Sequence, residues 1–131
     1  MIVVDASVVA PALADDDRDG DRARSRLRGE RLVAPQLIDL EVVSVIRKAL
    51  FAGALDERRA AMALADLVAL RLERVSHRPL LERVWALRDN LTPYDAAYVA
   101  LAEALSVTLV TCDKPLSRAP GVPCEIEYLG A

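Results

Sequence analysis

Four acidic residues are the side chains in this sequence best placed to do chemistry. Asp5 and Asp113 each follow a short apolar run, whereas Glu41 and Asp95 lie in segments with a helical pattern of apolar residues. A carboxylate beside apolar surface is costly unless a partner offsets its charge. Four converging carboxylates would also raise one another's pKa unless a cation lay between them. Because Mg²⁺ and Mn²⁺ prefer oxygen ligands, the pattern predicts a metal-dependent enzyme acting on phosphate esters.

Each of these acids also has a structural alternative. Asp5 could cap the helix that follows it, and Asp113 could cap the turn before Pro115. The segment 92–95 has the pattern of a capping box, and Glu41 could be a solvated residue at the rim of its helix. Four such coincidences in one chain favour a shared site.

The elements that must position these acids alternate between strand and helix. The expected strands are 2–4, 31–34, 72–76, 107–110 and 125–129, and the expected helices are 7–14, 21–28, 36–51, 56–70, 79–90 and 92–105. This alternation indicates an α/β fold with a mostly parallel sheet covered by helices on both faces. Ligands of such sheets gather at the carboxyl ends of the strands, where Asp5 and Asp113 are both expected.

Composition indicates one compact domain spanning residues 1–131. Hydrophobic residues make up 53% and charged residues 28%, which is typical of an ordered α/β protein. Cys112 and Cys124 have neither the number of a disulfide framework nor the spacing of a zinc site. The first residues lack a basic leader, and no apolar run reaches the roughly 18 residues of a membrane span. We therefore expect a soluble cytoplasmic protein with reduced cysteines and no membrane segment.

Three segments carry a resemblance that covers essentially the whole chain. They are residues 4–7 (Val-Asp-Ala-Ser), 91–103 (Leu-Thr-Pro-Tyr-Asp-Ala-Ala-Tyr-Val-Ala-Leu-Ala-Glu) and 109–113 (Leu-Val-Thr-Cys-Asp). With Glu41 on a helix between them, the chain resembles the PIN-domain ribonucleases, and more closely the VapC toxins of bacterial type II toxin–antitoxin pairs. One departure is that some members carry a further Asp or Asn just after the last acid, where this sequence has residues 114–117 (Lys-Pro-Leu-Ser). A second metal would then be weakly held or completed by substrate phosphate.

The resemblance implies a PIN-like three-layer α/β/α sandwich with a central, mostly parallel sheet. It implies a Mg²⁺-dependent endoribonuclease, with Mn²⁺ as an alternative cofactor, that cleaves RNA phosphodiester bonds by metal-activated water. It also implies a toxin that forms a homodimer and joins a cognate VapB-like antitoxin in a higher, inactive assembly. The family's acidic positions are occupied here by Asp5, Glu41, Asp95 and Asp113.

The chemistry of these residue types suggests a role for each acid. Asp5, Asp95 and Asp113 are predicted to ligate the metal directly or through water. Glu41 is predicted either to ligate the metal or to orient the attacking water. The residue types do not separate these two roles for Glu41.

Three further polar residues are candidates for a functional site. The hydroxyls of Ser7 and Thr111 could orient neighbouring carboxylates, or could be ordinary hydroxyls at a helix start and a strand end. His77 is the single histidine, which is too small a supply for a zinc site or a Ser-His-Asp triad. We expect His77 at the surface.

The charge balance bears on the RNA substrate. The chain has 17 basic and 20 acidic residues, a net charge of −3, unlike a general nucleic-acid binder. A local cluster could contact phosphates, or could be a solvated helix face paired with acidic neighbours; its members are Arg22, Arg24, Arg26, Arg28 and Arg31. Because aromatic residues are also few, the sequence favours selective cleavage of a structured RNA, such as tRNA or rRNA.

Two other functions are alternatives to a ribonuclease. An Asp-nucleophile phosphatase would use Asp5, but phosphatases of the haloacid-dehalogenase type need a second acid two residues later, where this sequence has Ser7. A catalytically weak or inactive PIN-like binding module would not need all four acids. For the antitoxin, apolar positions on 37–50 and 56–70 could line a groove for an amphipathic helix, although most of them are expected in the core.

Overall fold

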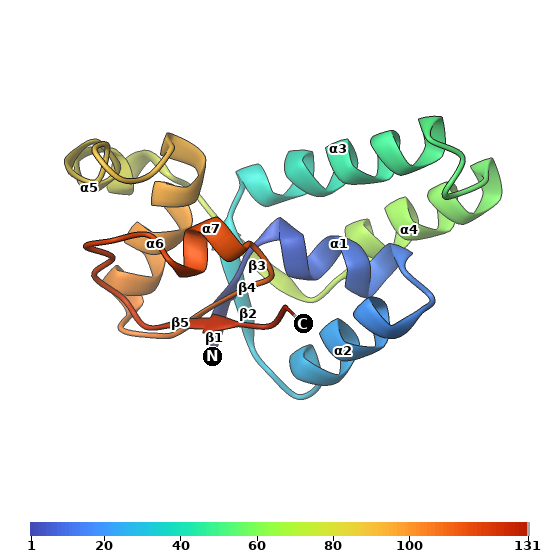
Figure 1. Cartoon of the computed structure of the whole chain (residues 1–131), viewed down its shortest axis with the longest axis horizontal. Coiled ribbons are helices and arrows are strands. Elements are labelled where there is room, and N and C mark those ends of the chain that lie inside the picture. Colours follow the sequence, from blue (N-terminus) through green and yellow to red (C-terminus); the bar gives the residue numbers. More distant parts are fainter. Residues whose placement is uncertain (131) are drawn as a thin grey trace.

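A five-stranded sheet forms the centre of residues 1–130, which are the residues that this computed structural model describes (Figure 1). Its strands are β1 (Ile2–Val4), β2 (Leu32–Pro35), β3 (Leu72–Val75), β4 (Leu109–Thr111) and β5 (Ile126–Tyr128). The order is β3-β2-β1-β4-β5, and every neighbouring pair is parallel. The chain first adds strands on one side of β1 and then on the other, so the strand order reverses between β1 and β4.

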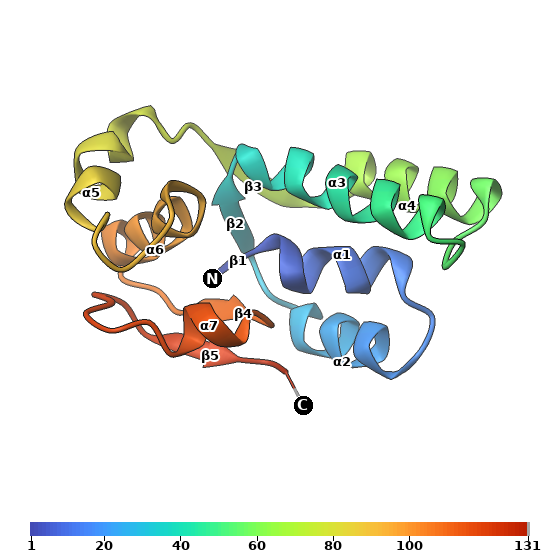
Figure 2. The same ribbon diagram turned by 45° about the horizontal axis from the view of Figure 1, so that its top comes forward.

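Helices cover both faces of this sheet. They are α1 (Ala6–Ala14), α2 (Arg18–Leu27), α3 (Leu37–Phe51), α4 (Glu57–Ala69), α5 (Leu81–Ala86), α6 (Pro93–Leu105) and the short α7 (Lys114–Ser117), with a 3₁₀ turn at Arg78–Leu80. Figures 1 and 2 show α1 to α4 on one side of the strands and α5 and α6 on the other. The expected three-layer α/β/α sandwich with a parallel central sheet is confirmed.

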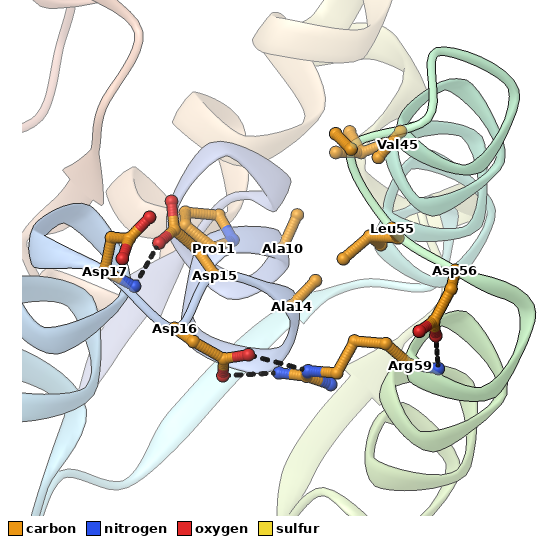
Figure 3. A pocket seen from close by; sticks show the side chains of 12 residues that line it. Ala10, Pro11, Ala14, Asp15, Asp16, Asp17, Val45, Leu55, Asp56 and Arg59 are labelled. Atoms are coloured by element: carbon orange, nitrogen blue, oxygen red, sulfur yellow. Dashed lines mark hydrogen bonds and ion pairs between the residues drawn. The ribbon is translucent and has the colours of Figure 1, made fainter.

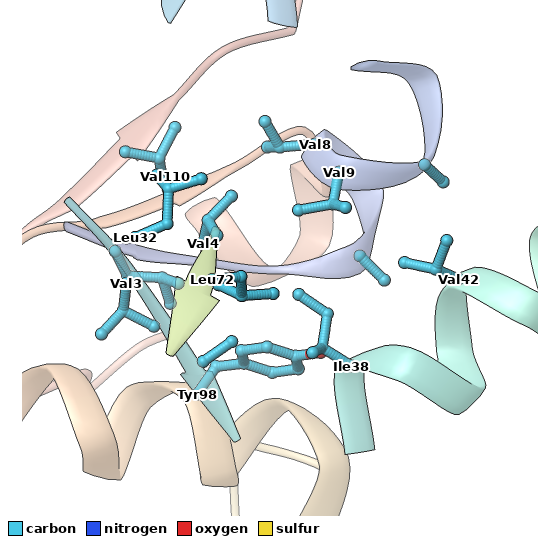
Figure 4. Packing of buried hydrophobic residues seen from close by; sticks show 14 of the residues in the cluster. Val3, Val4, Val8, Val9, Leu32, Ile38, Val42, Leu72, Tyr98 and Val110 are labelled. Carbon is cyan, nitrogen blue, oxygen red and sulfur yellow. The ribbon is translucent and has the colours of Figure 1, made fainter. Parts of the chain in front are cut away.

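The core lies where β-branched strand residues meet the apolar faces of the helices (Figure 4). Val3 and Val4 of β1 are fully buried, which is typical of a central parallel strand covered on both faces. On one side α1 contributes Val8 and Val9, and on the other α6 contributes Tyr98. Fully burying one such aliphatic side chain stabilises the fold by about 1.5–3 kcal/mol, so these contacts anchor the sheet edge described below.

Most of the expected elements are confirmed to within two residues, and four expectations need correction. Helix α2 begins at Arg18, three residues before its expected start. The helix expected over 79–90 is a 3₁₀ turn followed by the six-residue α5. Its apolar pattern was misleading because Trp85 is 68% exposed. The strand expected to stop before Pro35 includes this proline, which pairs with Val75 at the end of β2. Helix α7, over Lys114–Ser117, was expected only as a turn.

No helix within residues 1–130 is both long enough and apolar enough to cross a membrane.

Candidate functional site

The candidate site lies at the carboxyl ends of β1 and β4, where the strand order reverses. Because the two strands are parallel neighbours, Asp5 after β1 and Asp113 after β4 reach the same edge of the sheet. The Asp5 N–H donates to the Val110 carbonyl at 3.4 Å, which continues the strand pairing to the site itself. This edge is where open α/β sheets bind ligands.

Asp5 is buried, with 5% of its surface exposed, and two hydroxyls hold its carboxylate. Its Oδ1 accepts from the Ser7 N–H at 3.1 Å and from Ser7 Oγ at 2.5 Å. Its Oδ2 accepts from Thr111 Oγ1 at 2.6 Å. The Ser7 N–H contact caps α1, so Asp5 has both the capping role and the position at the sheet edge that the sequence offered as alternatives.

The Thr111 hydroxyl also connects Asp5 to Asp113. Thr111 Oγ1 donates to Asp5 and accepts from the Asp113 N–H at 2.9 Å. Asp113 in turn caps α7, because its Oδ1 accepts from the Leu116 N–H at 3.0 Å. Ser7 Oγ accepts from the Cys112 N–H at 2.8 Å, which adds a second link between α1 and the end of β4. The structure thus places both predicted hydroxyls on the Asp5 carboxylate, and Thr111 also contacts Asp113.

Asp95 and Glu41 reach the site from two helices. Asp95 lies in the first turn of α6, where its N–H donates to Thr92 Oγ1 at 3.2 Å, which is one of the two hydrogen bonds of the capping box expected there. Glu41 lies in the second turn of α3 and is half-buried, not fully solvated. Its Oε1 accepts a 2.5 Å hydrogen bond from the Tyr98 hydroxyl of α6.

The four acids share one electrostatic environment. Burial raises the pKa of Asp5 to about 6; the Ser7 and Thr111 hydrogen bonds lower it in part, and the charges of Asp113 and Asp95 raise it further. Burial also raises the pKa of Asp95, to which the charge of Asp113 adds. Burial raises the pKa of Glu41 as well, again with a contribution from Asp95. The charge of Asp95 therefore acts on both Asp5 and Glu41, as expected when no cation separates like charges.

The donor chemistry fits a hard divalent cation, although no complete ligand cage is preformed. Within residues 1–130, no three His, Cys, Asp or Glu side chains are grouped so that they could hold a metal ion as they stand. Every fully buried side-chain N and O in these residues has a hydrogen-bond partner, so Asp113 Oδ2 and Glu41 Oε2, which accept no hydrogen bond from these residues, are not fully buried. Mg²⁺ commonly binds through one or two carboxylates, several waters and substrate phosphates. The arrangement suits that open mode of binding.

Tyr98 is the residue at this site that the sequence analysis missed. It is buried in the core, with 2% exposed, yet its hydroxyl contacts Glu41. The sequence contains a signal for Tyr98. It lies three residues after Asp95 and therefore on the same face of α6, and its neighbours include alanines, which carry no polar group. A buried Tyr hydroxyl usually has a hydrogen-bond partner, so its position predicted a polar contact near Asp95.

Other charged residues support the elements around the site. Asp39 forms an ion pair with Arg74 at 3.0 Å. The Arg74 guanidinium also donates to the carbonyls of Leu67, Leu70 and Leu72, so it ties the start of α3 to the segment between α4 and β3. His77 is exposed, as expected.

Most of the arginine cluster is engaged with acidic neighbours. Arg22 pairs with Asp19, Arg24 with Asp21, and Arg31 with Glu73. Arg26 binds Glu127 at 2.6 Å and Glu30 at 2.9 Å. The structure therefore supports the alternative of a charge-paired helix face for these residues, and it provides no free row of guanidinium groups for RNA phosphates.

A hollow of about 630 Å³ lies between α1, α3 and the start of α4 (Figure 3). Its apolar lining includes Ala10, Val45 and Leu55, and aspartates stand at its rim. Arg59 closes one end, where it donates to Asp16 at 3.0 Å and to the Leu13 carbonyl at 2.8 Å. Some of the apolar side chains of α3 and α4 are thus accessible, whereas others, such as Val42 and Ala63, are in the core as expected.

Comparison with known proteins agrees with this fold. The PIN domain family matches residues 2–122. Ribonuclease VapC1 of Mycobacterium tuberculosis is 44% identical over 128 residues, which are 97% of this chain and 96% of that protein. The crystal structure of a protein from Pyrobaculum aerophilum superposes with a TM-score of 0.68 at 26% identity, covering 88% of this chain and 82% of that one. VapBC2 from Rickettsia felis, bound to a promoter DNA fragment, has the same fold with a TM-score of 0.68 at 16% identity, covering 98% of each chain. The chain therefore belongs to the PIN-domain family and is a relative of the VapC ribonucleases.

Proposed function

We propose that this chain, folded as one PIN domain, is a Mg²⁺-dependent endoribonuclease and the toxin of a VapBC-type toxin–antitoxin pair. The observation that carries the proposal is the convergence of Asp5, Glu41, Asp95 and Asp113 at the β1/β4 edge. This convergence occurs in a chain that is 44% identical to ribonuclease VapC1 over nearly its full length.

Each acid has a part in the proposed chemistry. A bound Mg²⁺ or Mn²⁺ would supply positive charge that favours proton loss from a water and offsets the charge on the phosphoryl oxygens. Asp5, Asp95 and Asp113 would hold this cation directly or through water. Ser7 and Thr111 keep the Asp5 carboxylate in one orientation. Glu41, whose Oε2 accepts no hydrogen bond from residues 1–130, would complete the ligand set or orient the attacking water.

The proposed substrate is a structured RNA such as tRNA or rRNA. A net charge of −3 and arginines already paired with acids leave little sequence-independent attraction for phosphate backbones. A shaped RNA can be recognised through its geometry with fewer basic contacts. The proposal therefore predicts few cleavage sites in a mixed RNA pool.

The proposed partner is a VapB-like antitoxin. The hollow between α1, α3 and α4 is lined by apolar side chains and by aspartates, which suit an amphipathic segment that carries basic residues. An arginine of such a segment placed among the four acids could take the place of the cation, because a guanidinium binds carboxylates in a bidentate manner. We also propose a homodimer in the cytoplasm, which joins the antitoxin in a higher assembly.

The test is incubation of the purified protein with total cellular RNA in Mg²⁺ and in EDTA, followed by mapping of the new RNA ends. We expect a small set of discrete, metal-dependent ends that are absent with an Asp5→Asn variant. Cleavage of every RNA at similar rates would contradict the selective substrate. The absence of any metal-dependent cleavage would contradict the nuclease.

A further inference from the structure

The contact between Tyr98 and Glu41 directly links the two helices that carry Glu41 and Asp95. The Tyr98 hydroxyl donates to Glu41 Oε1 at 2.5 Å, across 57 positions of the sequence. Glu41 accepts no other hydrogen bond and pairs with no cation among residues 1–130. Its orientation at the site therefore depends on this tyrosine.

Tyr98 is held rigidly enough to set that orientation. Its side chain is 2% exposed and belongs to the main hydrophobic core. Figure 4 shows the ring reaching across the core from α6, with its hydroxyl end beside Ile38 of α3. An aromatic side chain has only two rotatable bonds, so packing around the ring also fixes the direction of the hydroxyl.

A hydroxyl at this place is not needed to fill the core. Phenylalanine has the same ring, and it would avoid the cost of burying a polar group. The hydroxyl therefore points to a role outside packing, and its partner is one of the four acids.

The contact leaves the other half of the Glu41 carboxylate available. Tyr98 occupies Oε1. Oε2 has no protein donor in residues 1–130 and is not fully buried, because every fully buried side-chain oxygen there is paired. A neutral phenol also holds the carboxylate without cancelling its charge, whereas Lys or Arg would compete with a bound cation.

We propose that Tyr98 is a positioning residue that holds Glu41 in one rotamer, in which Oε2 is available as a ligand of the cation. This inference rests on the proposed nuclease function, and it adds a residue that contacts neither the substrate nor the cation. Residues that orient the groups at a metal site typically change activity or metal affinity by about 10- to 100-fold when they are removed.

A double-mutant cycle tests the proposal, with Tyr98→Phe, Glu41→Gln, the double variant, and Tyr128→Phe as a matched control. Tyr128→Phe removes the same atom from an exposed tyrosine on β5, whose hydroxyl forms no hydrogen bond with residues 1–130. We expect Tyr98→Phe to lower kcat by about 10- to 100-fold with KM unchanged within about twofold. We expect the double variant to be no worse than Glu41→Gln alone, because Tyr98 acts through Glu41. Independent, multiplicative losses would overturn the proposal, and so would wild-type kinetics of Tyr98→Phe.

Stabilisation by Mn²⁺ provides a readout that does not depend on RNA cleavage. Wild type and Tyr128→Phe should show an equal rise in Tm with Mn²⁺, and Tyr98→Phe should need more Mn²⁺ for the same rise. If the wild type binds Mn²⁺ but cleaves no RNA, the nuclease proposal fails, and the Mn²⁺ titrations still decide the role of Tyr98. Identical titrations for wild type and Tyr98→Phe would overturn that role.

If Tyr98→Phe does not fold, the variant Glu41→Asp tests the same hydrogen bond by changing its acceptor. Glu41→Asp keeps the charge but shortens the side chain by one methylene, so it withdraws the carboxylate from the Tyr98 hydroxyl. We expect a similar loss of Mn²⁺ stabilisation. A wild-type Mn²⁺ titration for Glu41→Asp would overturn the proposal.

Discussion

Thr111 and Asp5, which are 106 positions apart, share a 2.6 Å hydrogen bond at the carboxyl ends of two neighbouring strands. The same hydroxyl accepts from the Asp113 N–H at 2.9 Å. One buried side chain therefore sets the relative position of two of the four acids. These contacts favour the orienting role of Thr111 over that of an ordinary strand-end hydroxyl.

Thr111→Val should lower both stability and activity. Valine fills the same space, but it leaves the Asp113 N–H without its acceptor and Asp5 Oδ2 without its donor. Losing a partner of a buried polar group costs about 1–3 kcal/mol, which urea denaturation would detect as a lower midpoint. Thr111→Ser is the matched control, because it keeps the hydroxyl. Equal stability and activity of the Val and Ser variants would contradict the orienting role.

Asp5→Asn should remove a pH-dependent cost of the fold. Burial raises the pKa of Asp5 from 3.8 to about 6, so the folded state binds this proton more tightly than the unfolded state. This contribution to stability is present below pH 4 and is lost as the pH rises to about 6, a change of about 3 kcal/mol. Measured in EDTA, the free energy of unfolding of wild type should therefore fall relative to that of Asp5→Asn across this window. Parallel pH profiles for the two proteins would contradict the raised pKa.

Divalent cations should stabilise wild type at neutral pH. A ligand that binds only the folded state at 100 times its Kd adds about 2.7 kcal/mol to the free energy of unfolding. Asp95→Asn should lose much of the Mg²⁺- and Mn²⁺-dependent rise in Tm, because the charge of Asp95 acts on both Asp5 and Glu41. Asp66→Asn, on the exposed face of α4, is the matched control and should retain it. An equal metal response of the two variants would place the cation elsewhere.

Arg26→Ala should affect stability and leave RNA recognition unchanged. Arg26 joins α2 to β5 through Glu127 and also binds Glu30, and these contacts hold the pKa values of both carboxyls below their usual range. Its removal should cost about 1 kcal/mol, as is usual for partly exposed ion pairs. The KM for RNA should stay within about twofold of wild type, because the guanidinium is already paired. A large rise in KM would instead indicate that the arginine cluster binds RNA.

The fold was largely predictable because its signals are local. The β-branched run of β1, the Asp56 cap of α4, whose Oδ1 accepts from the Arg59 N–H, and the Thr92 cap of α6 each act within a few residues. Helix α5 was predicted too long because its apolar residues include Trp85, which is exposed. The Trp85 ring stacks with Arg88, whose Cζ lies 4.6 Å from the ring centroid. The apolar pattern of this segment therefore did not indicate which of its residues are buried.

The site was predictable only in its acids and its two hydroxyls. Carboxylates at the ends of apolar runs are visible in a sequence, because their position conflicts with burial unless a partner is present. The contact of Tyr98 with Glu41 and the ion pair of Asp39 with Arg74 join positions 57 and 35 residues apart. Such pairings depend on how the helices and strands pack, which a local pattern does not contain.

The most direct test of the central claim is the cleavage rate of a defined RNA, taken from the mapped substrates, as a function of Mg²⁺ concentration. Wild type and Asp66→Asn should cleave with the same Mg²⁺ dependence, stop in EDTA, and recover when excess Mg²⁺ is added. Alanine variants of Asp5, Asp95 and Asp113 should each lose cleavage while remaining folded. Cleavage that persists in EDTA, or that survives in the Asp5→Ala variant, would contradict metal-dependent hydrolysis at the β1/β4 edge.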